Sequence, residues 1–269
     1  MQFDIHTFIL GAVQGLCEFL PVSSSGHLAL LQHFLGFRDE NLVAFDLLLH
    51  CATVLVIMIF FWRDIWQIII EWCGGWFTGK RLSGWSYGWA IIIATIITGI
   101  IGLPLRKIVD EMSASPLYVG CGLIFTAMVM AVVPVMSRSS KNPSLLSIAI
   151  AVGIAQGIAV LPGVSRSGMT IAAGLVMGLG VSEAFRFSFL ISVPAVLGAS
   201  LLEALKVMKG SEGVFLPAGY LWAVLAAFVL GFLALGLMRR LVLAGKWAYF
   251  GFYCLIVGAI AVLSSLEMF

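Results

Sequence analysis

The stretch Pro21-Val-Ser-Ser-Ser-Gly-His27 interrupts a long apolar segment, and a related stretch, Pro162-Gly-Val-Ser-Arg-Ser-Gly168, interrupts a second one. Both lie in a gapless match of the chain to itself at a displacement of 142 residues. The matched pairs are Gln14/Gln156, Ser23/Ser165, Ser25/Ser167, Gly26/Gly168, Gly11/Gly153, Gly15/Gly157, Gly36/Gly178, Phe45/Phe187 and Val54/Val196. Broken helices at corresponding places of two repeats point to a binding site in a membrane protein, so function is expected where the two breaks meet.

The amino-acid composition indicates that this chain lies in a lipid bilayer. Hydrophobic residues make up 61% of the 269 residues and charged residues 10%, and the mean hydropathy is +1.10. A soluble globular protein carries about a quarter charged residues, so the sequence predicts a polytopic membrane protein surrounded by lipids. The net charge of +2 gives no reason to expect a nucleic-acid partner. The N-terminus has no basic region, and no cleaved signal peptide is expected.

Helix lengths predict six crossings and two hairpins. A crossing needs about 20 mostly apolar residues, and six segments meet this length: 42–62, 85–103, 117–136, 185–205, 218–238 and 246–266. The apolar stretches beside each break are too short to cross: 8–20 with 28–37, and 145–161 with 170–179. Each break therefore predicts a re-entrant helical hairpin, whose non-helical tip must be buried in protein or line a cavity. Residues 65–77, rich in Trp, predict a helix at the membrane surface.

The number of crossings between the hairpins predicts an inverted-topology repeat. Segment 42–62 follows the first hairpin, two crossings precede the second hairpin, and segment 185–205 follows it. The equivalent segments then run in opposite directions, and the two tips meet near the middle of the membrane. We therefore expect an all-α protein that forms a single integral membrane domain over residues 1–269, with repeat 1 at about 1–136 and repeat 2 at about 145–269.

Basic residues predict the orientation. Loops rich in Lys and Arg stay in the cytoplasm. One end of the predicted spans carries the larger set, Arg63, Lys80, Arg81, Arg138, Lys141, Arg239, Arg240 and Lys246, and the other end carries Arg38, Arg106, Lys107, Lys206 and Lys209. The larger set is predicted to be cytoplasmic, which places both termini and the opening of the site outside.

Two polar side chains share one face of the helix before the first tip. Gln14 and Glu18 are four residues apart, about one helical turn. A carboxylate inside a membrane segment is costly and usually marks a pathway or a site. Glu18 is therefore predicted to be functional. Gln14 either acts in the site together with Glu18 or only donates a structural hydrogen bond to a neighbouring carbonyl.

The first tip predicts an anion site. Ser23, Ser24, Ser25 and Gly26 open a new half-helix, whose free N–H groups and hydroxyls favour an anion, phosphate above all. Serine-rich turns also occur as ordinary helix caps, so the turn alone is a weak signal.

One histidine follows this turn directly. His27 ordinarily titrates close to neutral pH and has hydroxyls beside it in the sequence, which predicts an acid–base or nucleophilic role. The other three histidines are interpreted as satisfied structural groups: His6, His33 and His50.

The second tip supplies a cation. Arg166 stands where the first repeat has Ser24, and a guanidinium at this depth needs an anionic partner. A two-pronged grip on phosphate is one such partner, and a structural ion pair with Glu18 is the other. The remaining predicted contacts to the bound group are Gln156, Ser165, Ser167, Gly168 and Thr170.

Both motifs resemble those of one family. The segment from Gln14 to His27 resembles the (E/Q)xxxE-FLPVSS-[ST]-GH motif of the undecaprenyl-pyrophosphate phosphatase family, also called the bacitracin-resistance protein family. Pro162-Gly-Val-Ser-Arg-Ser-Gly-Met-Thr170 resembles its PGxSRSGxT motif. The likeness runs from about residue 5 to the last span. Two positions depart from the common pattern: Gln14, where many members have glutamate, and Met169, where alanine is frequent.

The resemblance implies hydrolysis of a polyprenyl diphosphate lipid, undecaprenyl diphosphate, to the monophosphate carrier and phosphate. It also implies a divalent cation, Mg²⁺ or Ca²⁺, and a site on the outer side of a bacterial inner (plasma) membrane. In this reading Arg166, with Ser165 and Ser167, holds the phosphates, and Glu18, with Gln14, orients the metal. Ser24, His27 or water attacks the terminal phosphorus.

A second class of function fits the same architecture. Inverted repeats with broken helices are typical of transporters, so a flippase for a polyprenyl phosphate or a transporter of a small anion is the alternative. The sequence leaves open whether the protein forms a homo-oligomer.

Overall fold

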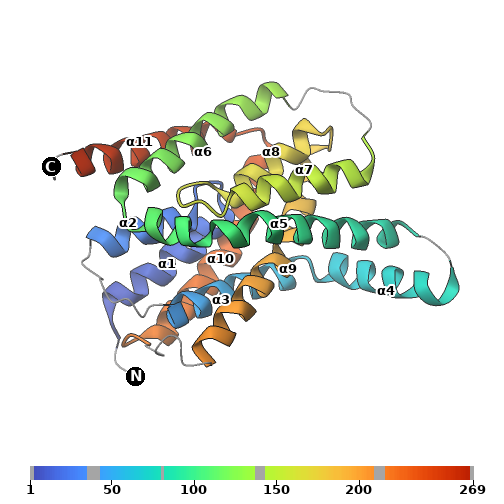
Figure 1. Cartoon of the computed structure of the whole chain (residues 1–269), viewed down its shortest axis with the longest axis horizontal. Helices are drawn as coiled ribbons and strands as arrows, with labels where there is room; N and C mark the ends of the chain where they lie inside the picture. Colours follow the sequence, from blue (N-terminus) through green and yellow to red (C-terminus); the bar gives the residue numbers. More distant parts are fainter. Residues whose placement is uncertain (1–2, 35–42, 80–81, 137–142, 209–215, 267–269) are drawn as a thin grey trace.

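The computed structural model describes residues 3–34, 43–79, 82–136, 143–208 and 216–266, which form helices and turns without any β-strand (Figure 1). The predicted all-α class is therefore confirmed. In chain order the helices are α1 Ile5–Phe19, α2 Ser24–Phe34, α3 Val43–Phe60, α4 Trp62–Thr78, α5 Ser83–Ser113, α6 Pro116–Met136, α7 Leu145–Ile158, α8 Arg166–Val176, α9 Val181–Met208, α10 Tyr220–Leu243 and α11 Trp247–Leu266.

Five of the described helices are long and apolar enough to cross a membrane, namely α5, α6, α9, α10 and α11, and they match five of the six predicted spans. The sixth prediction, 42–62, corresponds to α3, which qualifies as a span only together with α4. The chain bends by 76° between these two helices. The described helices thus fit a multi-pass membrane protein with five spans, or six when the bent pair counts as one.

Aromatic packing holds α4, which contains the predicted surface helix, against the start of α5. The indole rings of Trp72 and Trp76 contact those of Trp85 and Trp89, with ring centroids 5.3 to 6.5 Å apart. Gly88 leaves room for Trp72, since a Cβ there would lie 2.5 Å from the indole.

The long helix α5 continues well beyond its predicted end at residue 103. The charged residues that end the apolar stretch do not end the helix, and one of them, Arg106, forms an ion pair with Glu203 of α9. Several basic residues used to predict the orientation lie outside the described part of the chain: Arg38, Lys80, Arg81, Arg138, Lys141 and Lys209.

Small residues bring each hairpin against a helix of the other half of the chain. A Cβ on Gly11 of α1 would lie 2.2 Å from the carbonyl oxygen of Ala223 in α10, and one on Gly153 of α7 would lie 2.8 Å from that of Ala94 in α5. Such close backbone contacts drive helix association in lipid, where apolar burial gives little advantage. The two repeats are thus interlocked around the tips.

Contacts at both ends show that α5 and α9 run in the same direction. The Tyr87 hydroxyl donates to Glu183 near the start of both helices, at 3.2 Å, and the pair of Arg106 with Glu203 joins their later parts.

Helix α3 runs the other way. Phe61, directly after α3, contacts Phe185 near the start of α9, with ring centroids 6.1 Å apart. Since α3 and α9 follow the two hairpins, opposite directions agree with an inverted repeat. The layout of the repeats relative to a membrane stays a prediction.

Candidate active site

The tips of the two hairpins pack directly on each other. A Cβ on Gly26 of the first tip would lie 2.9 Å from the Cα of Gly163 in the second. The Ser167 hydroxyl, at the start of α8, donates to the carbonyl of Leu20 across the junction at 3.2 Å. The site is therefore assembled from residues about 140 positions apart in the sequence.

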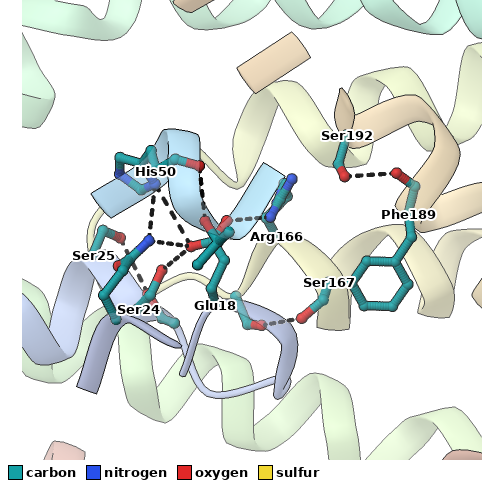
Figure 2. Close-up of polar contacts among 12 residues, drawn as sticks. Glu18, Ser24, Ser25, His50, Arg166, Ser167, Phe189 and Ser192 are labelled. Carbon is teal, nitrogen blue, oxygen red and sulfur yellow. Dashed lines mark hydrogen bonds and ion pairs between the residues drawn. The ribbon is translucent and has the colours of Figure 1, made fainter. Parts of the chain in front are cut away.

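Glu18 lies at the centre of the junction (Figure 2). Its Oε1 accepts a short hydrogen bond from Nη2 of Arg166, and its Oε2 accepts one from the Ser24 hydroxyl at 2.6 Å and one from the Gln14 amide at 3.1 Å. The side chains of Glu18 and Arg166 are only 7% and 18% exposed. Burial of both charges strengthens their attraction, and loss of either one would leave the other without a counter-charge.

The second tip is tied to α6. Thr126 donates its hydroxyl to the Gly163 carbonyl at 2.9 Å and accepts the backbone N–H of Ser165 at 3.0 Å. Ser165 then caps α8, accepting the N–H of Gly168 at 3.2 Å. Gly163 has φ +82° and is so close to α6 that a Cβ would lie 2.2 Å from the Val119 carbonyl oxygen. This fixed tip sets the position of Arg166.

A cavity of about 40 Å³ opens at the junction. It is lined by Cys17, Glu18, Ser23, Ser24, Ser25, Ala159, Val164, Ser165, Arg166 and Ser167. A volume of this size holds only one or a few waters, so a larger ligand can enter only if the side chains that line the cavity move.

The structure places several predicted residues together and others apart. Glu18, Ser24 and Arg166 are in contact. Gln156 instead donates its amide to Thr98 of α5 at 3.1 Å, and Thr170 shares a hydrogen bond with Ser188 of α9 at 2.5 Å. Gly168 packs against Met130 and Pro21. These three therefore support the second hairpin and do not line the cavity.

His27 does not line the cavity either. Its Nδ1 lies 2.8 Å from the carbonyl oxygen of Ser23, and its Nε2 lies 2.8 Å from the hydroxyl of Tyr253 on α11. Both ring nitrogens are engaged away from Ser24 and Glu18.

His50 of α3 reaches the site instead. Its Nδ1 lies 3.0 Å from the Gln14 amide nitrogen and 3.8 Å from Oε2 of Glu18. His50 is interpreted from the sequence as a structural group, although a polar residue inside an apolar span is a signal of function. Nothing in the sequence singled out Tyr253.

Two buried polar atoms at the site lack hydrogen-bond partners among the described residues: Oε1 of Gln14 and Nη1 of Arg166. The first belongs to the amide whose nitrogen donates to Glu18, and amide and carboxylate oxygens are ligands that Mg²⁺ and Ca²⁺ prefer. The second is a guanidinium donor suited to a phosphate oxygen. No cluster of three or more His, Cys, Asp or Glu occurs in the described part of the chain, so a cation here needs ligands from water or from a bound phosphate.

Fold and site together define a multi-pass membrane protein in which a buried carboxylate binds a partly buried serine and arginine at the junction of two broken helices. The family model of bacitracin resistance protein BacA matches residues 7–260, and the chain belongs to this family. Similar proteins named undecaprenyl-diphosphatase occur in Methanosphaera stadtmanae, 38% identical over 98% of this chain and 99% of the relative, and in Bacteroides thetaiotaomicron, 38% identical over 97% and 99%. One from Korarchaeum cryptofilum is 39% identical over 97% of this chain and 98% of its own length.

Proposed function

We propose that this protein hydrolyses undecaprenyl diphosphate to undecaprenyl monophosphate and inorganic phosphate, which recycles the lipid carrier of cell-wall synthesis. The observation that carries the proposal is the hydrogen-bonded group of Arg166, Glu18 and Ser24, in which a cation, a proton acceptor and a hydroxyl meet. Membership of the BacA family and the names of the relatives support the substrate.

Arg166 is the phosphate-binding residue in this proposal. Its Nη1 has no partner in the described structure, and its Nη2 is held by Glu18. An incoming diphosphate would take the guanidinium through two parallel hydrogen bonds. The starts of α2 and α8 add free backbone N–H groups that favour an anion.

Ser24 is the proposed nucleophile. Of the three candidates that the sequence left open, it is the one whose hydrogen already points to a carboxylate. Once phosphate takes Arg166, Oε1 of Glu18 is free to hold a cation, while Oε2 keeps the Ser24 hydroxyl and accepts its proton. The Ser24 oxygen then bonds to the terminal phosphorus, its proton passes to Glu18, and the bond to the bridging oxygen breaks, which releases the lipid monophosphate.

Water completes the reaction. The proton on Glu18 leaves with the lipid monophosphate, which restores the carboxylate. A water then attacks the phosphoserine and gives a proton to Glu18, the bond between Ser24 Oγ and phosphorus breaks, and Glu18 returns this proton to the Ser24 oxygen as inorganic phosphate leaves. The phosphoserine splits one difficult hydrolysis into two easier steps.

A divalent cation, Mg²⁺ or Ca²⁺, is also part of the proposal. Glu18 and the unpartnered Oε1 of Gln14 would hold it, with phosphate oxygens and waters as further ligands. When bound, such an ion neutralises charge on the transferred phosphoryl group.

We place the protein in the bacterial inner membrane with the site open to the outside. Exposed Arg240 belongs to the larger basic set and exposed Lys107 to the smaller one. In a variant without the native cysteines, Arg240→Cys should react with an impermeant thiol reagent only after the membrane is breached, and Lys107→Cys in intact cells. The reverse pattern would turn the orientation around and leave the chemistry unchanged.

The activity itself is tested by phosphate release from undecaprenyl diphosphate by purified protein in detergent, with and without chelator. We expect release that the chelator suppresses and that Mg²⁺ or Ca²⁺ restores. Ser24→Ala should be inactive, whereas Ser264→Ala on α11 should match the parent. Rapid quenching should trap an acid-stable phosphoserine. Absence of release under all metal conditions would refute the phosphatase and favour transport, and full activity of Ser24→Ala would refute the nucleophile.

A further inference from the structure

The contacts of His27 fix which nitrogen carries its proton. The carbonyl oxygen of Ser23 can only accept a hydrogen bond, so Nδ1 is the donor. The neutral ring then has a lone pair at Nε2, which accepts the Tyr253 hydroxyl. The two rings are stacked, with centroids 5.5 Å apart and planes inclined by 6°. The Ser23 carbonyl therefore fixes the tautomer of His27, and Tyr253 holds the ring in its orientation.

The carbonyl that His27 holds belongs to a strained residue. Ser23 has φ +67° and is the one non-glycine residue with positive φ among those described. This conformation is unfavourable for an L-residue and persists only where neighbours impose it. Ser23 also accepts the backbone N–H of His27 at 3.2 Å. Two hydrogen bonds from one residue thus keep the turn in place directly before Ser24.

The second tip supports this interpretation. Met169 occupies the place of His27 there, and the turn is held by Thr126 of α6. Helices α6 and α11 pack against each other along their length, and a Cβ on Gly120 would lie 2.8 Å from the Gly258 carbonyl oxygen. Each tip is thus tied to one helix of the same pair, the second tip directly and the first tip through His27.

We infer that His27 and Tyr253 are positioning residues, which hold Ser23 in its left-handed conformation and so direct the Ser24 hydroxyl to Glu18. This inference rests on the proposed function for the role of Ser24. It assigns no proton transfer to His27 and gives the last helix of the chain a part in building the site.

The first test reads the tautomer directly and needs no activity. In protein labelled with ¹⁵N-histidine, the His27 signals should show a protonated Nδ1 and a bare Nε2 at a pH where the ring is neutral. Tyr253→Phe keeps the stacked ring and removes the hydroxyl, so the Nε2 signal should shift because this nitrogen loses its hydrogen-bond donor, while Nδ1 stays protonated through its bond to Ser23. Tyr249→Phe, one turn earlier and exposed, is the control and should change nothing. A protonated Nε2 in the parent protein would overturn the inference whether or not the protein is a phosphatase.

The second test separates positioning from phosphate binding. Loss of the hydroxyl in Tyr253→Phe should lower kcat about 3- to 10-fold, the effect of one hydrogen bond, with little change in KM because Arg166 is untouched. A rise in KM at constant kcat, or no change in either, would contradict the assignment.

The third test asks whether His27 takes part in the chemistry. The amide of His27→Asn can occupy the place of Nδ1 and donate to Ser23, so this variant should keep at least tenfold more activity than His27→Ala. His33→Asn serves as the matched control and should be silent. Equal inactivity of His27→Asn and His27→Ala would overturn the inference, as would rescue of His27→Ala by substituted imidazoles at rates that rise with their basicity.

Discussion

The two tips share a sequence pattern but differ in where the backbone turns, in how they are held and in which side chains they present. The second tip turns at Gly163, which adopts positive φ without strain, and Thr126 binds its backbone directly. The first tip turns at Ser23, a residue strained by positive φ, and depends on His27. The second tip thus holds Arg166 on a backbone without strain. The first tip holds the Ser24 hydroxyl next to a strained residue, whose conformation is imposed by its neighbours.

Three substitutions at equivalent positions account for this division. At the displacement of 142 residues, Glu18 corresponds to Val160, Ser24 to Arg166 and His27 to Met169. The carboxylate and hydroxyl come from one repeat and the guanidinium from the other. The two repeats therefore form an asymmetric site, because each one contributes functional groups that are absent at the equivalent positions of the other.

The largest expected effect comes from neutralising the first tip. Glu18→Gln removes the proton acceptor of Ser24 and the partner of Arg166, and we expect phosphate release to fall about 100- to 10,000-fold. Phosphate release across a magnesium titration measures it, with exposed Glu111→Gln as the control. Full activity at any magnesium concentration would make Glu18 only a structural partner of Arg166.

A substitution of Arg166 at the second tip should have the next largest effect on activity. Arg166→Lys keeps the charge but cannot reproduce a planar two-pronged grip, so we expect a loss of roughly 30- to 1,000-fold in kcat/KM. Arg239→Lys, exposed on α10, is the matched substitution and should be silent. Turnover of the lysine variant near that of the parent would contradict the phosphate-binding role.

Moving the two tips apart should lower activity less than substituting Glu18 or Arg166. In Gly26→Ala the new methyl would meet backbone of Gly163 at 2.9 Å, so Ser24 and Arg166 should move apart. We expect about 10- to 100-fold lower kcat together with a lower melting temperature, since overpacking costs about 1–3 kcal/mol. Gly99→Ala is the control, because a Cβ there has no atom within 4 Å. Equal behaviour of the two variants would mean that the tips need not touch.

Loss of the hydrogen bonds from Thr126 to the second tip should have a smaller effect on activity. Thr126→Val leaves the Gly163 carbonyl and the Ser165 N–H without their partner, and we expect kcat/KM to fall about 5- to 50-fold. Thr95→Val, which removes only a bond to the carbonyl of its own helix, should be nearly silent. Comparing kcat and KM with those of Tyr253→Phe sharpens the contrast: the Thr126 change should raise KM, because it displaces the phosphate-binding tip.

Gln14→Glu should have the smallest effect. The related family pattern admits either residue at this position, and a second oxygen ligand near Glu18 would hold a cation at least as well. Phosphate release should stay within a few-fold of the parent, with a lower magnesium requirement. A loss as large as that of Glu18→Gln would show that the amide donor to Glu18 is essential.

Much of this site was predictable because its signals are local. A carboxylate, an arginine and serine-rich turns inside apolar sequence violate the composition of a membrane interior, and Glu18, Ser24 and Arg166 do come into contact. The predicted roles of Gln156 and Thr170 in substrate binding stay predictions, although the structure turns both side chains to neighbouring helices. Repeat symmetry indicated that they lie in the second hairpin but not which helix packs beside each of them.

The sequence by itself determined the solvent, the helical class and the two broken helices, because hydropathy and the Ser, Gly and Pro breaks are properties of short segments. Only the tertiary structure decided that His50 reaches Glu18, that His27 turns to Tyr253, and that α5 extends to Ser113. Each of these depends on contacts between helices far apart in the chain. The direction of a side chain at such a contact follows from the packing of both helices, which no single segment encodes.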